Sequence, residues 1–152
     1  MTLDELVTAM AVDRVACFAA QLEVQADGTS KFTTQCSAYA YLVCAVRGVP
    51  MLVATANKQH DWLMKEGRAV GWTPINRDAA ARFAEREECT VVASAKAAVN
   101  GHIAVCVPVP AGEKGLWVSS AGRNCFVRAP IERSFGASLV PSYFVFTKEM
   151  RS

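Results

Sequence analysis

The feature that most constrains this chain is a change of hydrophobic pattern near Cys89. Before that residue, apolar side chains recur at helical spacing, as in Leu3, Leu6, Val7 and Met10. After it, short runs rich in β-branched and aromatic residues are separated by turn-forming residues. Helices followed by a run of strands are typical of an α+β domain. We therefore expect N-terminal helices packed on a C-terminal antiparallel sheet.

Capping residues and helix-stopping residues place the expected helices. The first apolar pattern continues through Val15 to Leu22, past a break near Asp13, and ends at the turn-forming stretch 26–30. Further helices are expected to begin with Thr33 or Thr34, with Thr55, and with Asn76 or Asp78 as N-cap. The expected strands cover residues 89–94, 102–107, 116–120 and 143–146, with 108–115 as a hairpin-like connection.

Composition indicates one domain spanning residues 1–152. The chain has 152 residues, is 52% hydrophobic and carries a net charge of +2, so it can bury a core but is too weakly basic to indicate nucleic-acid binding. Its six cysteines form no Cys-x-x-Cys pair, and the two histidines are His60 and His102. We expect no metal and no cofactor, mostly buried cysteines, and at most one disulfide.

The N-terminal residues Met1–Leu6 include two acids where a secretory signal would carry Lys or Arg. No apolar run approaches membrane-spanning length, so no membrane insertion is expected. These features predict synthesis as a soluble cytoplasmic protein, which would need a secretion machine or cell lysis to act in the periplasm or at the cell wall.

Cys36 and His102 are the candidate catalytic pair. Cys36 lies at the expected start of a helix, where unpaired amides and the helix dipole favour a thiolate. His102 opens an expected strand, and imidazole can take the thiol proton and return it to a leaving amine. Strand alternation puts His102, Ala104 and Cys106 on one face, which we expect to meet the Cys36 helix.

Two further roles are expected around this pair. A third polar group normally orients the imidazole, and Ser119 on the next strand is the first candidate, with Ser120 or Asn124 behind it. The backbone amide of Cys36 is a natural oxyanion donor, with Gln35 as an assisting group. Purely structural roles are the alternatives to these functional ones. Cys36 would then be a small buried residue, His102 a sheet histidine, His60 a helix-surface residue and Arg123 a solvated charge.

The residues resemble a known family. Cys36-Ser37, Gly48-Val49-Pro50-Met51 and Gly101-His102-Ile103-Ala104-Val105 look like the NlpC-type papain-like cysteine peptidases and amidases that cut peptidoglycan, including type VI secretion amidase effectors and phage-encoded lysins. The resemblance runs from about Thr34 to Lys148. It implies a papain-like fold, Cys36 as nucleophile, His102 as base, and a His, Asn or Gln as third member. Ser119 in that role departs from the pattern.

The resemblance implies a peptidoglycan hydrolase that cleaves an amide bond in the stem peptide through a thioester. An antibacterial secreted effector would be accompanied by an immunity protein, and a phage-type endolysin would share the chemistry. A non-catalytic cell-wall-binding relative is a different class, indicated by the missing conventional third residue. A redox protein using the other cysteines is a third possibility.

Overall fold

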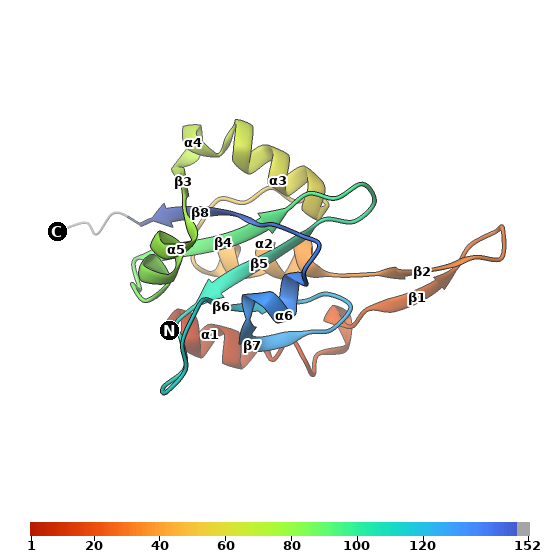
Figure 1. The fold of residues 1–152 in the computed structure, drawn as a ribbon, viewed down its shortest axis with the longest axis horizontal. Helices are drawn as coiled ribbons and strands as arrows, with labels where there is room; N and C mark the ends of the chain where they lie inside the picture. Colours follow the sequence, from red (N-terminus) through yellow and green to blue (C-terminus); the bar gives the residue numbers. More distant parts are fainter. Residues whose placement is uncertain (149–152) are drawn as a thin grey trace.

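The central element is a six-stranded antiparallel sheet with strand order β3-β8-β4-β5-β6-β7 (Figure 1). The computed structural model describes residues 1–148, without the side chains of Glu23, Lys31, Phe32 and Thr33. In this part the sheet strands are β3 (Trp72–Ile75), β4 (Cys89–Ala95), β5 (His102–Val107), β6 (Trp117–Ser120), β7 (Phe126–Pro130) and β8 (Ser142–Thr147). The helices are α1 (Leu3–Met10), a 3-10 turn (Ala16–Phe18), α2 (Cys36–Val46), α3 (Ala56–Lys65), α4 (Gly67–Val70), α5 (Arg77–Ala84) and α6 (Ile131–Phe135).

Helices cover both faces of the sheet. The α2 helix lies behind β4 and β5 in Figure 1, and α5 and α6 lie in front. One core cluster joins α1 and α2 to Val92, Ile103 and Val105. The other joins α5 and α6 to Val91 and Ala104. The predicted α+β class with an antiparallel sheet is confirmed, but the helices form two layers around the sheet, and α6 follows most of the strands.

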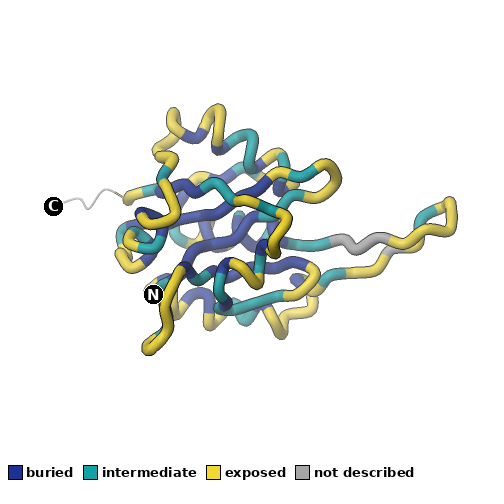
Figure 2. Tube along the Cα trace, viewed as in Figure 1, coloured by how far each residue is buried: buried dark blue, intermediate teal, exposed yellow. Residues whose placement is uncertain are grey.

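Burial on both faces explains why the central strands do not alternate between apolar and polar residues. All seven residues of β4 are buried, and so are the last five of β5 (Figure 2). Such strands are enclosed by helices on each side. The sequence runs at 89–94 and 102–107 are accordingly confirmed as strands, and the hairpin-like connection at 108–115 joins the antiparallel pair β5 and β6.

Capping side chains set several helix starts. Thr55 accepts a hydrogen bond from the Lys58 amide, and Asn76 accepts one from the Ala79 amide. Both were expected N-caps, and both are confirmed. The N-cap of α2, however, is Gln35, without a side-chain capping bond, so Thr33 and Thr34 are not the caps. The helix therefore begins at Cys36 itself.

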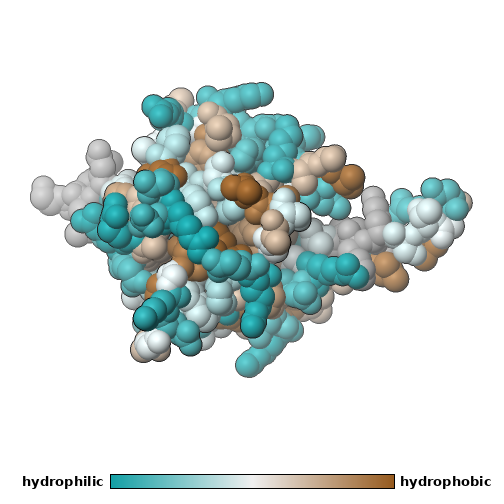
Figure 3. Space-filling model, in the orientation of Figure 1, coloured by the Kyte–Doolittle hydropathy of each residue, from teal (hydrophilic) through white to brown (hydrophobic). Residues whose placement is uncertain are grey.

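The expected helix over Val15–Leu22 is wrong. The chain makes a short 3-10 turn and then forms β1 (Gln21–Val24), which pairs with β2 (Ser30–Thr33). This hairpin projects from the body in Figure 1, and Leu22 and Val24 are 59% and 76% exposed. Figure 3 shows separate hydrophobic patches on it among hydrophilic residues. A turn at 26–30 flanked by Val24 on one side and Phe32 and Thr33 on the other, all of high strand propensity, favoured a hairpin over a helix.

Candidate functional site

Cys36 is the first residue of α2 and is 4% exposed. The amide of Tyr39 makes the first intrahelical bond, to the Gln35 carbonyl, so the amides of the first turn lack helical partners, as at any helix start. Burial raises the pKa of the Cys36 thiol, and interactions with the backbone of Ile103, the Thr34 side chain and the backbone of Ser37 only partly oppose this. The expected lowering of this pKa is therefore reversed.

His102 begins β5 and is half-buried. Its Nε2 lies 2.8 Å from the Ser134 hydroxyl, and its ring packs edge-on against Phe135 at 4.6 Å between centroids. Both partners belong to α6. Burial lowers the pKa of His102 to about 4, so the imidazole is neutral at pH 7.

The thiol of Cys36 and the imidazole of His102 lie on opposite faces of the sheet. Ile103, Val105 and Val107 belong to the cluster that contains Cys36 and α2, whereas Ala104 and Cys106 belong to the α5 and α6 cluster. His102 pairs in register with Ala95, also of the second cluster. The expected face assignment is therefore wrong. The bulkier β-branched side chains pack on α2, and the smaller ones face the alanine-rich α5.

Cys36 nevertheless contacts the strand that carries His102. The sulfur of Cys36 interacts with the backbone of Ile103, the residue that follows His102. Cys36 thus contacts β5 at the residue that follows His102, near the start of the strand.

Ser119 does not touch His102. It is fully buried on the α2 side, 2.6 Å from the Tyr39 hydroxyl, and donates to the Phe126 carbonyl. Its strand partner is Val105, three residues beyond His102. The structure does not support the expected role of Ser119 in orienting the imidazole. Ser119 pairs with Val105, whose side chain belongs to the core that contains α2, and its hydroxyl contacts Tyr39 of that helix instead.

Ser134 is the residue that sequence reasoning missed. Its hydroxyl lies 2.8 Å from both His102 Nε2 and the hydroxyl of Ser120. Ser120, a fallback candidate for the third role, therefore reaches the imidazole through Ser134. No periodicity marked this position, because α6 has five residues and follows directly on β7.

Two hollows flank the start of α2. A polar one of about 190 Å³ contains His102 and is lined by Thr34, Asn100, Gly101, His102, Gly122, Arg123, Asn124, Phe126, Arg133 and Ser134. An apolar one of about 340 Å³ runs along α2 and is lined by Ser37, Ala38, Tyr41, Leu42, Val53 and Ala54. Thr34 and Ser37 each line one hollow, and Cys36 lies between them in the chain.

Residues of α3 support the first turn of α2. Gln59, fully buried, donates from Nε2 to the carbonyls of Ser37 and Leu52. Among the described residues its Oε1 has no partner. His60 lies 2.8 Å from the buried hydroxyl of Ser94 through Nδ1, so it is tied to the sheet and is not a purely surface residue. These contacts hold the Cys36 turn against β4.

The chain has no match among protein-family models or among curated proteins. Within residues 1–148, no three His, Cys, Asp or Glu residues gather as metal ligands would. No helix in that range is long and apolar enough to cross a bilayer. All six cysteines are free thiols, and four of them are buried.

Proposed function

We propose that the protein is a peptidoglycan hydrolase of the papain-like, NlpC-type class, with Cys36 as nucleophile and His102 as base. The observation that carries the proposal is that Cys36 begins α2 and that its chain neighbours Thr34 and Ser37 line, respectively, a polar hollow containing His102 and an apolar groove. A peptide laid across this turn would present a carbonyl carbon to the sulfur. The unpaired amides of the turn would stabilise the oxyanion.

In this mechanism the sulfur adds to the carbonyl carbon of an amide in the stem peptide, and the thiol proton passes to the imidazole. The carbon–nitrogen bond then breaks, the imidazolium gives its proton to the leaving amine, and water hydrolyses the thioester. His102 must leave Ser134 and turn around the first residue of β5 to reach the sulfur. Substrate binding, which displaces water from the polar hollow, would supply the free energy for this change.

The test is release of soluble muropeptides from purified peptidoglycan. Cys36→Ala should reduce the rate at least about a thousandfold, as expected for loss of a nucleophile, and His102→Ala should do the same. Cys17→Ala is the matched control, because Cys17 is an exposed thiol outside the site. Undiminished hydrolysis by Cys36→Ala, with the fold intact by circular dichroism, would refute this mechanism.

A second candidate is a non-catalytic cell-wall-binding relative of the same fold. The burial of Cys36 and the Ser134 partner of His102 favour it, since neither group is poised for chemistry in this arrangement. It is distinguished by cosedimentation with peptidoglycan without any release of muropeptides by the unmodified protein.

We further propose that the hydrolase acts in the periplasm or at the cell wall as an antibacterial secreted effector, with a phage-type endolysin as the alternative. An effector would have an immunity protein that covers the Cys36 turn. Copurification of such an inhibitor from the producing cell would support the effector, and lysis activity from a phage-infected host would support the endolysin.

A further inference from the structure

The hydroxyl groups of Ser120 and Ser134 form a short hydrogen-bond chain that ends at His102. The Ser134 oxygen lies 2.8 Å from the Ser120 oxygen and 2.8 Å from His102 Nε2. Ser120 is 1% exposed, and within the described part of the chain its hydroxyl has Ser134 as its one hydrogen-bond partner. A buried hydroxyl hydrogen without an acceptor is costly. Ser120 therefore donates to Ser134.

This donation sets the direction of the whole hydrogen-bond chain. A neutral imidazole carries a proton on one ring nitrogen and a lone pair on the other. If Ser134 accepts from Ser120 and donates to Nε2, both hydroxyl hydrogens have an acceptor, and the ring proton of His102 resides on Nδ1. A proton on Nε2 would instead direct two donors at the Ser134 oxygen and leave the Ser134 hydrogen without an acceptor in the chain. The first arrangement is the one that satisfies every donor.

The surroundings of the ring hold His102 in this orientation. Phe135 packs edge-on against it, with 4.6 Å between the ring centroids. On the other side, a Cβ at Gly122 would come within 3.4 Å of Cε1 and 4.0 Å of Nδ1. The imidazole thus presents Nε2 to α6 and its Nδ1 edge to Gly122.

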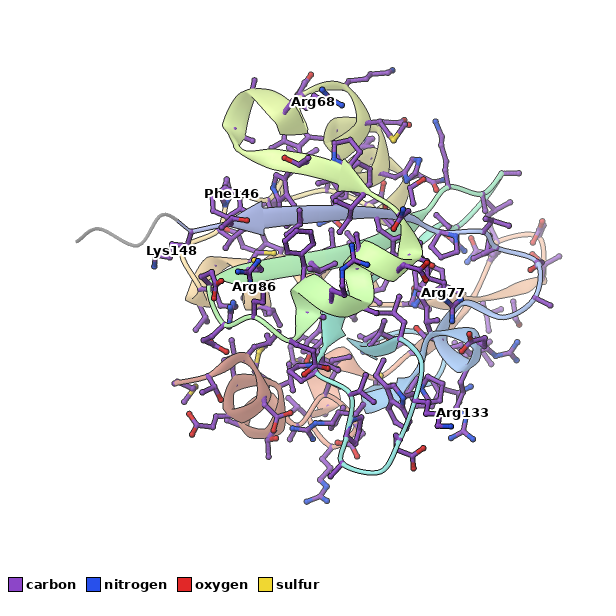
Figure 4. All side chains as sticks on the ribbon, turned by 60° about the vertical axis from the view of Figure 1, so that its left-hand side comes forward. Arg68, Arg77, Arg86, Arg133, Phe146 and Lys148 are labelled. Carbon is purple, nitrogen blue, oxygen red and sulfur yellow. The ribbon has the colours of Figure 1, made fainter. Side chains whose placement is uncertain are left out.

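Ser134 can be reached from outside the molecule, whereas Ser120 is buried. Ser134 lines the polar hollow of about 190 Å³ that contains His102. Its neighbour Arg133 is exposed and lies at the periphery of the molecule in Figure 4. A peptide that enters the hollow can therefore contact the Ser134 hydroxyl without disturbing the core.

We propose that Nε2 of His102 is the base atom of the hydrolase and that Ser134, held by Ser120, is a gate that keeps this atom occupied in the free protein. This inference rests on the proposed function for the role of His102. When a carbonyl oxygen of the bound peptide accepts the Ser134 hydrogen instead, the lone pair of Nε2 is released and the ring is free to turn. Nε2 then takes the proton of the Cys36 thiol as the carbon–sulfur bond forms, and the imidazolium later gives that proton to the leaving amine.

The first measurement locates the ring proton in the natural full chain without substrate. Nitrogen-15 NMR of histidine-labelled protein at pH 7 distinguishes a protonated ring nitrogen from an unprotonated one. The chain has two histidines, so the signals that disappear in His102→Gln belong to His102. Its Nδ1 should carry the proton, and its Nε2 should be unprotonated. A proton on Nε2 would overturn the gate.

The second measurement removes the gate. In Ser134→Ala the rate of muropeptide release should rise about fivefold, the change expected when one neutral hydrogen bond no longer has to be broken. The ring proton of His102 should then be shared between the two nitrogens. Ser134→Thr keeps the hydroxyl group and should retain both the natural rate and the proton on Nδ1.

Ser138→Ala is the matched control, because Ser138 is exposed and lies beyond the end of α6. It should change neither the rate nor the proton position. A rate in Ser134→Ala that equals the natural rate would overturn the gate. A lower rate would also overturn it, since Ser134 would then assist the base instead of blocking it.

Failure of this inference is separable from failure of the proposed function. If Cys36→Ala abolishes hydrolysis but Ser134→Ala gives no acceleration, the hydrolase stands and the gate falls. If hydrolysis survives Cys36→Ala, the Cys36 mechanism falls. A ring proton on Nδ1 that moves in Ser134→Ala would then still support the assigned direction of the hydrogen-bond chain, and a proton on Nε2 would refute it.

Discussion

At the scale of single residues, the candidate site combines a buried thiol with an imidazole held by a serine. Both groups are displaced from their ordinary titration range by burial, in opposite directions. Each is therefore uncharged at neutral pH in this arrangement. For the proposed hydrolase this arrangement would be a resting state, and its activation would require movement of His102 as well as deprotonation of Cys36.

The first prediction concerns the reactivity of Cys36. Because its pKa is raised and its side chain is 4% exposed, iodoacetamide should alkylate it much more slowly than the exposed Cys17 at pH 7. Peptide mapping by mass spectrometry at timed intervals measures both rates in one sample. Faster modification of Cys36 than of Cys17 would show that the thiol is activated in the free protein.

The second prediction concerns the pH dependence of stability. His102 has a folded-state pKa of about 4, below the value of about 6.5 in an unfolded chain. Above pH 6.5 both states are neutral and the group costs nothing. As pH falls from 6.5 to 4, only the unfolded state gains the proton, so stability falls by about 3 kcal/mol at most.

Urea unfolding of the natural protein and of His102→Gln, at several pH values, isolates this contribution from the surface carboxylates. As the pH falls, the free energy of unfolding of the natural protein should decrease more than that of His102→Gln. If the difference between the two proteins stays constant from pH 7 to pH 4, the pKa of His102 is not lowered in the folded state.

At the scale of elements, the position of the site depends on the contacts that the two ends of α2 make with the rest of the molecule. Its first turn is held by Gln59 of α3, and its last turn by Arg47, the C-cap. Arg47 donates to the Thr90 hydroxyl, to the Glu87 carboxylate and to the carbonyls of Glu87 and Cys89. These contacts fix α2 against the start of β4.

The third prediction follows from that anchor. Arg47→Ala should lower the free energy of unfolding by about 2–3 kcal/mol, because the partly buried Thr90 hydroxyl and Cys89 carbonyl lose their donor. Arg47→Lys should recover less than half of the loss, since a lysine ammonium group cannot donate to all the acceptors that the planar guanidinium group reaches. Urea denaturation measures both. Equal stability of the lysine variant and the natural protein would mean that charge alone matters.

The elements also show what a sequence can and cannot predict. Thr55 and Asn76 mark helix starts because a cap is a local hydrogen bond, readable from a few neighbouring residues. The β3 strand was missed because Pro74 and a length of four residues hide its pattern. The face of β5 was misassigned because β5 is buried on both sides, so its alternation carries no polar signal. The Ser134 contact joins α6 to β5, and no local pattern encodes it.

At the scale of the whole molecule, the sheet is assembled from distant parts of the chain. The last strand, β8, lies between β3 and β4. It pairs Ser142–Thr147 with β4 and Tyr143–Phe146 with β3. Phe144 joins the α2 core, and Val145 joins the α5 core. Both cores therefore depend on the same strand.

The fourth prediction tests this dependence. A chain ending at Pro141 should lose the cooperative urea transition, because two ladders of the sheet and both cores are left incomplete. Circular dichroism follows the transition. Val140→Ser is the control, since Val140 is 88% exposed and its change should alter stability by less than about 0.5 kcal/mol. A cooperative transition in the truncated chain would show that β3 and β4 can close on each other.

The central place of β8 has a consequence for biosynthesis. Until β8 has been synthesised, β3 and β4 have no strand to join them, and the core around α2 lacks Phe144. Completion of the sheet must await the last strand. If the protein is the proposed hydrolase, its activity would therefore arise only after β8 has been made.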